Sequence, residues 1–461
     1  MNTKLKNIFF EDSKAKMIIR NGEVIYRMLV KPIFIVDTDN IEFESSGGTT
    51  TFNITANDSW SMTIPNFVTV SSLTGYGNAT ITVTTTGETS ETELTGNIVI
   101  TCGSKTHTIA VTQKSSGPDY SKMFFTIEVL SAGTIYFKKN TAAAQTCSWS
   151  CRTNGGNWET KTSDTGTTSS NSLYLSDGDI VEIRKTSENL TSGDTTYYNY
   201  FDCTSSAKFN IYGNIMSIAD NTNEDDDLTT KSLTRNYQCY RTFYSWKGLV
   251  NASNLVFPNN ITQYCYYSMF QGCTSLTTAP ELPAITLAEA CYLYMFQGCT
   301  SLVTAPELPA TTLANACYQR MFYGCTSLTT APSSLPATTL SNQCYYEMFY
   351  NCRGLTSTPA LPATTLANRC YWGMFSNCSS LTTAPELPAT TLADYCYYNM
   401  FQGCTNLNYI KCLATDISAS NCTINWVSGV SATGTFVKAL GMSGWSSGNS
   451  GIPDGWTVQE E

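Results

Sequence analysis

Cysteine is the residue type in this chain with the most obvious chemical potential, occurring 19 times against a single histidine, His107. Cysteines in a regular series could hold metal ions or form disulfides. Metal sites usually need histidines or Cys-x-x-Cys clusters, and equivalent side chains in stacked repeats point the same way, which disfavours a bridge between them. We therefore expect buried free thiols that fill tight core sites, with no metal and no cofactor. Two series recur at a step of 26 or 27 residues: Cys265, Cys291, Cys317, Cys344, Cys370 and Cys396, and Cys273, Cys299, Cys325, Cys352, Cys378 and Cys404.

Carboxylates also recur, because Glu281, Glu307 and Glu386 occupy the same turn in three repeats. A glycosidase needs two carboxyl groups that face each other across a substrate, and equivalent positions stacked on one face do not provide that arrangement. With one histidine, there is no Ser/His/Asp or Cys/His set to propose. We expect no enzymatic activity.

Aromatic side chains are the remaining candidates for recognition. Two positions of the repeat vary between copies, and we expect both to face outward. Exposed aromatics in a row can stack on sugar rings or anchor a protein partner; the alternative is that they pack on neighbouring coils or subunits. Residues 261–410 hold six acidic and three basic side chains, so the surface suits neutral glycans. The candidate binding residues are Tyr267, Tyr294, Tyr346, Trp372 and Tyr398.

The element that must position these side chains is the repeat itself. In the third copy, Thr311 and Thr312 can cap a helix, and apolar residues from Leu313 to Met321 fall on one helical stripe. Gly324 can end the helix, a short β-prone segment follows, and Pro332 stops it. The predicted unit is one helix, one short strand and a turn, which gives an α/β solenoid over residues 236–425. A single unit cannot bury its apolar face, but stacked copies can.

The string Met-Phe-x-Gly-Cys-Thr-Ser-Leu-Thr-Thr-Ala-Pro, seen at residues 321–332, resembles the type 5, BspA-like leucine-rich repeat. That resemblance implies surface adhesion and binding of proteins or glycans, without catalysis. Residues 426–461 are rich in glycine and serine and are expected to cap the last coil. Their Gly-Ile-Pro-Asp-Gly-Trp-Thr string resembles the ends of BspA-like proteins and of phage proteins from gut Bacteroidales.

Upstream of the repeats, the pattern is all-β. Short alternating runs punctuated by Gly, Asn and Ser predict an immunoglobulin-like sandwich over residues 34–116 and a second β-rich domain over residues 117–235. Trp60, Ile64-Pro65, Phe67-Val68, Gly75-Tyr-Gly77 and the closing run to Gln113 resemble the BACON domain. That resemblance implies carbohydrate or mucin binding; the alternative is a spacer with Trp60 in its core.

The first 33 residues carry seven Lys/Arg and three Asp/Glu. Alternating apolar residues flank an Asn-Gly pair, which fits a tight hairpin turn. Since an isolated hairpin is only marginally stable, we expect residues 1–33 to dock on another surface. This opening resembles the virion-attachment starts of crAss-like and related phage fibres. The candidate attachment residues are Ile18, Ile19, Asn21, Gly22, Val24 and Tyr26.

Charge and hydropathy narrow the choice of partners. The net charge of −10 argues against nucleic acid, and the sequence has no run of 18 apolar residues that would insert in a membrane. The N-terminus also lacks the apolar core of a secretory signal, so export by the general pathway is not expected.

Two functions remain. The first is a bacteriophage virion fibre or decoration protein, made in the host cytoplasm and held to other virion proteins through its N-terminus. Its distal repeats would meet a host-surface glycan, mucin or protein. The second is a bacterial cell-surface adhesin that binds glycans, which requires an export signal. Fibres often form trimers, although no coiled-coil heptad supports one here.

Overall fold

The computed structural model describes residues 6–8, 15–20, 23–29, 33–87, 93–115, 118–142, 144, 146–186, 198–220 and 225–461, with the backbone alone for the first three segments. The chain divides into two compact units, Met1–Asp119 and Tyr120–Glu461. Each unit is treated separately below. Within the described segments, no helix has the length and apolar character needed to cross a membrane.

The N-terminal sheet confirms the predicted hairpin. Strand β1 (Lys6–Ile8) pairs with β2 (Ala15–Arg20), and β2 pairs antiparallel with β3 (Glu23–Leu29). Arg20 is opposite Glu23, so the connection consists of Asn21 and Gly22, which lie outside the described residues.

The rest of the first unit is a β-sandwich, as predicted. One sheet has the order β4-β6-β10-β8, and the other has the order β5-β12-β11-β7-β9. Alternate residues of both sheets enter a common core. Trp60 is buried in that core, and its indole Nε1 donates to the carbonyl oxygen of Gly77 at 3.0 Å. The strands are β4 (Phe34–Val36), β5 (Asn40–Phe43), β6 (Gly48–Ala56), β7 (Ser59–Thr63), β8 (Thr69–Val70), β9 (Thr74–Tyr76), β10 (Ala79–Thr85), β11 (Leu94–Cys102) and β12 (Lys105–Gln113).

The second unit begins with two further sheets, ordered β16-β15-β18-β13-β20-β21 and β17-β14-β19. Strand β21 (Leu249–Val256) pairs in parallel with β20 and belongs to the first coil of the repeats. One continuous apolar core runs from Phe125 to Trp456. The other elements are β13 (Phe125–Ser131), β14 (Gly133–Lys139), β15 (Ser148–Thr153), β16 (Glu159–Thr162), β17 (Ser172–Leu175), β18 (Ile180–Lys185), β19 (Asn199–Cys203), β20 (Lys208–Asn214), α1 (Met216–Ala219) and the 3-10 helix η1 (Leu228–Thr230).

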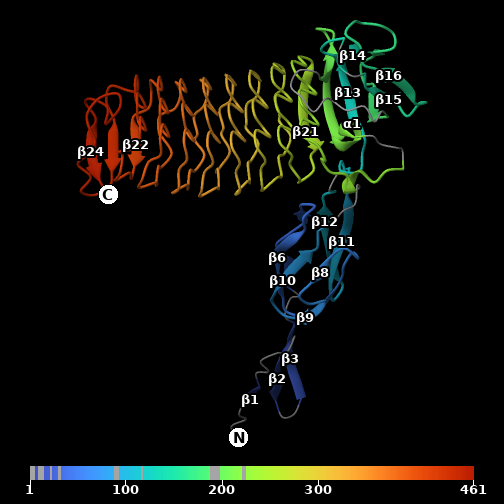
Figure 1. Cartoon of the computed structure of the whole chain (residues 1–461). Helices are drawn as coiled ribbons and strands as arrows, with labels where there is room; N and C mark the ends of the chain where they lie inside the picture. Colours follow the sequence, from blue (N-terminus) through green and yellow to red (C-terminus); the bar gives the residue numbers. More distant parts are fainter. Residues whose placement is uncertain are drawn as a thin grey trace. The chain divides into compact units, whose positions relative to one another are not determined.

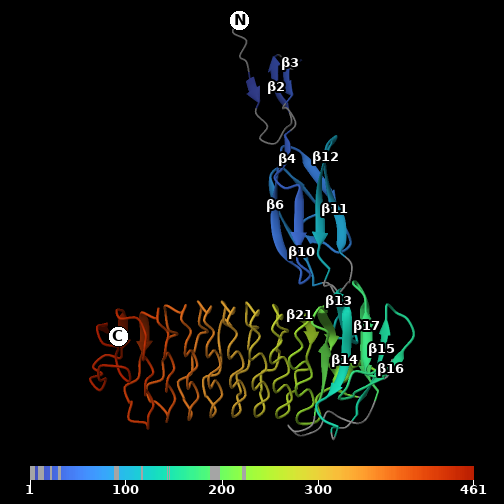
Figure 2. The same cartoon turned by 90° about the horizontal axis from the view of Figure 1, so that it is seen from above.

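The repeats form a stack of parallel coils between β21 and β22 (Tyr409–Cys412), and each repeat makes one coil (Figures 1 and 2). The predicted helix is wrong, because residues 225–461, all of them described, contain no helix beyond η1. The segment expected to be helical is instead a run of linked turns. The repeats are thus not the α/β solenoid that the pattern of apolar residues suggested.

Hydrogen bonding explains why the helix does not form. Every second N–H closes a tight turn: Met321 N donates to Tyr318 O at 3.2 Å. The N–H groups between them donate to the next coil, as Tyr318 N does to Cys344 O at 3.0 Å and Phe322 N to Met348 O at 2.9 Å. An α-helix satisfies its N–H groups within itself, whereas this segment depends on a neighbour for half of them.

Backbone conformation repeats every four residues, twice the period of the hydrogen bonds. Ala316, Arg320 and Gly324 have φ values of 55°, 52° and 73°, and the equivalent positions of the other coils are also left-handed. Non-glycine residues adopt this region at a cost of about 1–2 kcal/mol each. The bonds between coils and the packed core must compensate for that strain.

Core side chains form ladders along the stack. Residues equivalent to Cys317, Tyr318, Met321, Phe322 and Cys325 are buried in every coil from the second to the seventh. The phenylalanine rings stack with centroids 5.3–5.7 Å apart. All 19 cysteines are free thiols, and all but the half-buried Cys203 are buried, including the twelve of the two series for which burial was expected.

The C-terminal segment covers the last coil. Strands β22, β23 (Thr435–Lys438) and β24 (Thr457–Glu460) form a parallel sheet. Beside it, Trp426 Nε1 donates to Gly451 O at 2.8 Å, and Val427 N donates to Asn449 O at 3.2 Å. The N–H groups that would otherwise need another coil are thereby partly satisfied.

Candidate functional site

The five aromatics proposed for binding are all half-buried and lie on five coils of the stack, with the coil of Arg320 between those of Tyr294 and Tyr346. The expectation that both variable positions face outward holds for only part of each series. Leu293, Ser268 and Gly373 are buried. The linked turns bring these positions closer to the core than a helix would.

The surface that these residues form is larger than predicted, and we call it the aromatic strip. Its members are half-buried, and each except Arg241 touches another member through a ring, guanidinium or carboxylate contact. They come from two positions of the repeat beyond the predicted ones as well as from the first coil, where Arg241 contacts the rings of Tyr240 and Tyr244. The aromatic strip comprises Tyr237, Arg241, Tyr264, Tyr267, Tyr294, Arg320, Tyr323, Tyr346, Glu347, Tyr350, Arg369, Trp372, Tyr395 and Tyr398.

Ring orientation determines what the strip can bind. The Trp372 and Tyr398 rings lie 4.0 Å apart with planes 21° apart, and Tyr346 stacks on Trp372 at 5.6 Å from the preceding coil. The Tyr323 and Tyr350 rings are 4.7 Å apart and within 6° of parallel. Rings stacked this closely cover part of each other's faces, so these pairs present mainly hydroxyl groups and ring edges. Elsewhere in the strip the rings are inclined, and those of Tyr267 and Tyr294 meet at 73°.

Arg320 organises the middle of the strip. Its Nε is 2.6 Å from Glu347 Oε2, and its guanidinium also donates to the Tyr294 hydroxyl at 3.1 Å. The guanidinium carbon lies 5.5 Å from the Tyr346 ring centroid. Burial opposes ionisation of Arg320, but the hydrogen bond and charge of Glu347 raise its pKa overall. The pair is a fixed, mutually neutralised element.

Arg369 has different surroundings. Its guanidinium carbon lies 5.0 Å from the Tyr395 ring centroid and 5.5 Å from that of Trp372. It has no side-chain hydrogen bond or ion pair with any residue that the structure describes. Its donors are therefore available to a ligand, while ring faces hold the group in place.

The phenols of Tyr267 and Tyr346, two members of the strip, have a raised pKa. Burial raises the pKa of the Tyr267 phenol, and burial with the nearby Glu347 carboxylate raises that of Tyr346. Protonated phenols can both donate and accept hydrogen bonds.

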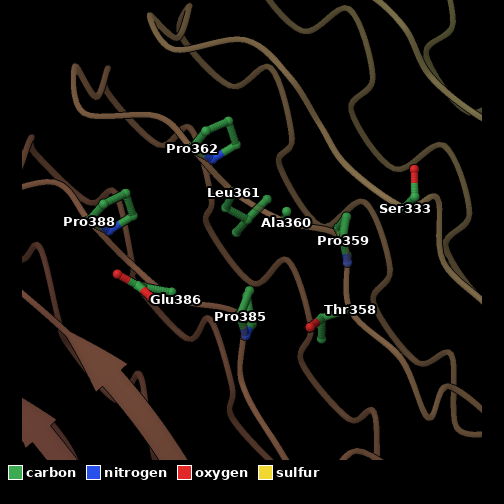
Figure 3. Close-up of a pocket in the computed structure, with 9 residues that line it drawn as sticks. All are labelled: Ser333, Thr358, Pro359, Ala360, Leu361, Pro362, Pro385, Glu386 and Pro388. Atoms are coloured by element: carbon green, nitrogen blue, oxygen red, sulfur yellow. The ribbon is translucent and has the colours of Figure 1, made fainter.

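A second feature lies on the proline turns of the coils. A cavity of 530 Å³ is lined by residues of neighbouring coils, and Figure 3 shows prolines around Leu361, with the Glu386 carboxylate beside Pro388. A matching cavity of 580 Å³ includes Glu281 and Glu307. Glu307 accepts from the Ser333 hydroxyl at 2.7 Å, and Glu386 pairs with Lys411 at 3.4 Å. These carboxylates thus connect neighbouring coils, and the cavities carry little chemistry of their own.

Metal and nucleophilic chemistry find no support within the described residues. No cluster of three or more His, Cys, Asp or Glu side chains there could hold a metal ion. Burial raises the pKa of the Cys325 thiol to about 12. His107 lies in the first unit, with Nε2 2.9 Å from Thr38 O and 3.2 Å from the Asp39 carboxylate.

Comparison with protein families agrees with the stacked coils. Residues 242–373 and 345–425 match the family model described as the BspA type leucine rich repeat region, in six copies. The repeats are of the BspA type. No curated protein matches the chain. A solved structure titled "Bacteroides ovatus GH5 xyloglucanase in complex with a XXXG heptasaccharide" is 20% identical over 20% of this chain and 21% of that chain, with a TM-score of 0.18. That match spans only about a fifth of either chain and carries no argument.

Sequence reasoning missed Arg369, Arg241 and the outer tyrosines of the strip. Their positions do vary between copies: the one that holds Arg369 also holds Tyr264, Ala290, Ala316, Gln343 and Tyr395. Comparing copies at every position would have identified them. What the sequence could not reveal was the set of contacts between neighbouring coils that joins four such positions into one surface.

Proposed function

We propose that this chain is a non-enzymatic adhesion protein whose BspA-type repeats bind a ligand on a host surface through the aromatic strip. One observation carries the proposal: half-buried Tyr, Trp and Arg side chains are concentrated in one line on a surface otherwise made of Thr, Ser and Asn. These three residue types dominate the energetics of binding sites.

The finer form of the proposal is a bacteriophage virion fibre or decoration protein. Residues 1–33 would attach to other virion proteins, since they form a basic hairpin sheet in which Ile19 is opposite Val24 and Ile18 is opposite Tyr26. The sandwich, which resembles the BACON domain, would act as a spacer. The burial of Trp60 in its core supports a spacer over a sugar-binding role.

Binding is tested with the labelled full-length chain on host cells. Replacing Trp372 and Tyr398 together with alanine is expected to lower cell binding at least about tenfold, as loss of two central anchors does. Tyr174→Ala is the matched control, because Tyr174 is 77% exposed on β17, away from the strip. Unchanged binding of the double variant, with the fold intact by circular dichroism, would refute the proposal.

The alternative is a bacterial cell-surface adhesin, which the adhesion-type repeats also support. Mass spectrometry of purified virions and of washed bacterial envelopes separates the two. The virion proposal expects the chain among virion proteins and its loss from particles when residues 1–33 are deleted. Detection in envelopes of phage-free cells alone would favour the adhesin.

A further inference from the structure

We propose that the aromatic strip recognises the acidic groups of a linear polysaccharide, with Arg369 as the main anchor. This inference rests on the proposed function and specifies its ligand. It replaces the expectation of a neutral glycan, which considered the number of charges but not where they lie.

The first argument is the charge on the strip. Its charged members are Arg241, Arg320, Arg369 and Glu347, and Glu289 accepts from the Tyr264 hydroxyl at 3.3 Å, so three positive charges and two negative leave a local charge of +1 on a chain whose net charge is −10. Glu347 is paired with Arg320. Arg241 and Arg369 have no carboxylate partner within the described residues.

The second argument is the geometry around Arg369. Ring faces at 5.0 and 5.5 Å hold its guanidinium, and it has no acceptor among the described residues. The nearby Asp394 carboxylate instead accepts the backbone N–H of Ser420 at 2.8 Å. A planar group with several free donors binds a carboxylate or sulfate through paired hydrogen bonds.

Arg241 repeats the arrangement at the first coil. Its guanidinium carbon lies 4.6 Å from the Tyr244 ring centroid and 5.1 Å from that of Tyr198, and one nitrogen donates to the Tyr198 hydroxyl at 3.1 Å. No acidic residue within the described segments pairs with it. One ring-held cation therefore lies at the first coil, and the other lies one coil before the far end of the strip.

The third argument concerns the form of the ligand. Strip residues advance one coil at a time, by about 4.8 Å per step, so the binding groups repeat along a line. A linear polysaccharide repeats its acidic groups and hydroxyls in the same way. The stacked pairs Trp372–Tyr398 and Tyr323–Tyr350 cover part of each other's faces, so hydrogen bonds from phenol edges and guanidinium groups provide the recognition there.

The test uses the full-length chain and three polymers with one backbone: dextran, carboxymethyl-dextran and dextran sulfate. We expect binding to one or both charged polymers and not to dextran, with affinity falling as salt rises from about 50 to about 300 mM. The carboxymethyl and sulfate polymers distinguish which acidic group is bound. Arg369→Gln should lower the affinity by about tenfold or more, the effect of losing a charged hydrogen-bond donor.

Arg353→Gln is the matched control, because it removes the same charge from an exposed arginine whose Nε donates to Asn351. The inference is overturned if the chain binds dextran as tightly as the charged polymers. It is also overturned if Arg369→Gln leaves the affinity for the charged polymers unchanged while the Trp372/Tyr398 double variant loses cell binding. Either result leaves the adhesion function intact. If protease treatment of the cells abolishes binding and charged dextrans do not compete with it, the partner is an acidic protein. That result also overturns the inference. Cell binding that survives the double variant refutes the adhesion function itself.

Discussion

At the residue scale, the cysteines of the series Cys273 to Cys404 have a structural role rather than a chemical one. Each thiol donates to the carbonyl oxygen of a phenylalanine in the preceding coil; Cys299 and Cys325 do so to Phe270 and Phe296 at 3.1 Å, and Cys352 does so to Phe322 at 3.0 Å. The thiol fills a small apolar site and supplies one weak donor, which accounts for its recurrence in every coil.

These thiols should therefore be inert in the native protein. Burial raises the pKa of Cys317, Cys325 and Cys370 to about 12, and only Cys203 is half-exposed. We expect at most one thiol to react with Ellman's reagent at neutral pH, because the reactive species is an accessible thiolate. All 19 should react in guanidinium. Rapid reaction of several native thiols would contradict the ladder packing.

At the element scale, the repeat shows where sequence reasoning succeeds and fails. The period, the buried Cys, Tyr, Met and Phe positions and the stacking of copies were predictable, since apolar residues that cannot be buried alone must be buried by neighbours. The helix was not, because the buried pairs Cys317-Tyr318 and Met321-Phe322 recur every four residues, a spacing that helices and linked turns share. The difference lies in hydrogen bonds to a coil 26 residues away, which no local pattern encodes.

In the linked turns, replacing alanine with glycine at a left-handed position should stabilise the fold, whereas the same change destabilises a helix. Ala316 has a φ of 55°, so Ala316→Gly should relieve left-handed strain and raise the free energy of unfolding by up to about 1 kcal/mol. In an α-helix the same change would lower it by about 1 kcal/mol. The control is Ala314→Gly, which lies in the same segment without a positive φ and should be destabilising. Urea unfolding of both variants measures the sign, and a destabilised Ala316→Gly would contradict the turn structure.

At the scale of the whole molecule, the all-β start, the sandwich and the stack of coils could be predicted from alternation and repetition. The candidate site was only half predictable. Tyr346, Trp372 and Tyr398 were identified from their variation, but their mutual stacking depends on coil spacing. Arg369 precedes Trp372 by three residues, a spacing that makes neighbours in a helix as well, so its contact with that ring could have been predicted. The proposed binding surface is therefore formed by the stack and not by any single repeat.

The stack also predicts a steep loss of stability in alkali. The unfolded chain releases thiol protons above a pKa of about 8.5, whereas burial keeps the folded thiols of Cys317 and Cys325 protonated to about 12 and raises the pKa of the Tyr318 phenol well above its usual value. Since the folded state holds more protons in this range, the contribution of these groups to the free energy of unfolding is constant below about pH 8 and falls as pH rises.

Each buried thiol contributes about 1.4 kcal/mol of this loss per pH unit, so the twelve thiols of the two series together exceed the roughly 5–15 kcal/mol that stabilises a typical domain. The repeats should therefore unfold cooperatively about one pH unit above the thiol pKa, which circular dichroism and urea unfolding at stepped pH would detect. The sandwich is the internal control, because its described core contains a single cysteine, Cys102. Coils that keep their full resistance to urea well above that pH would show that the thiols are not protonated groups sealed in the core.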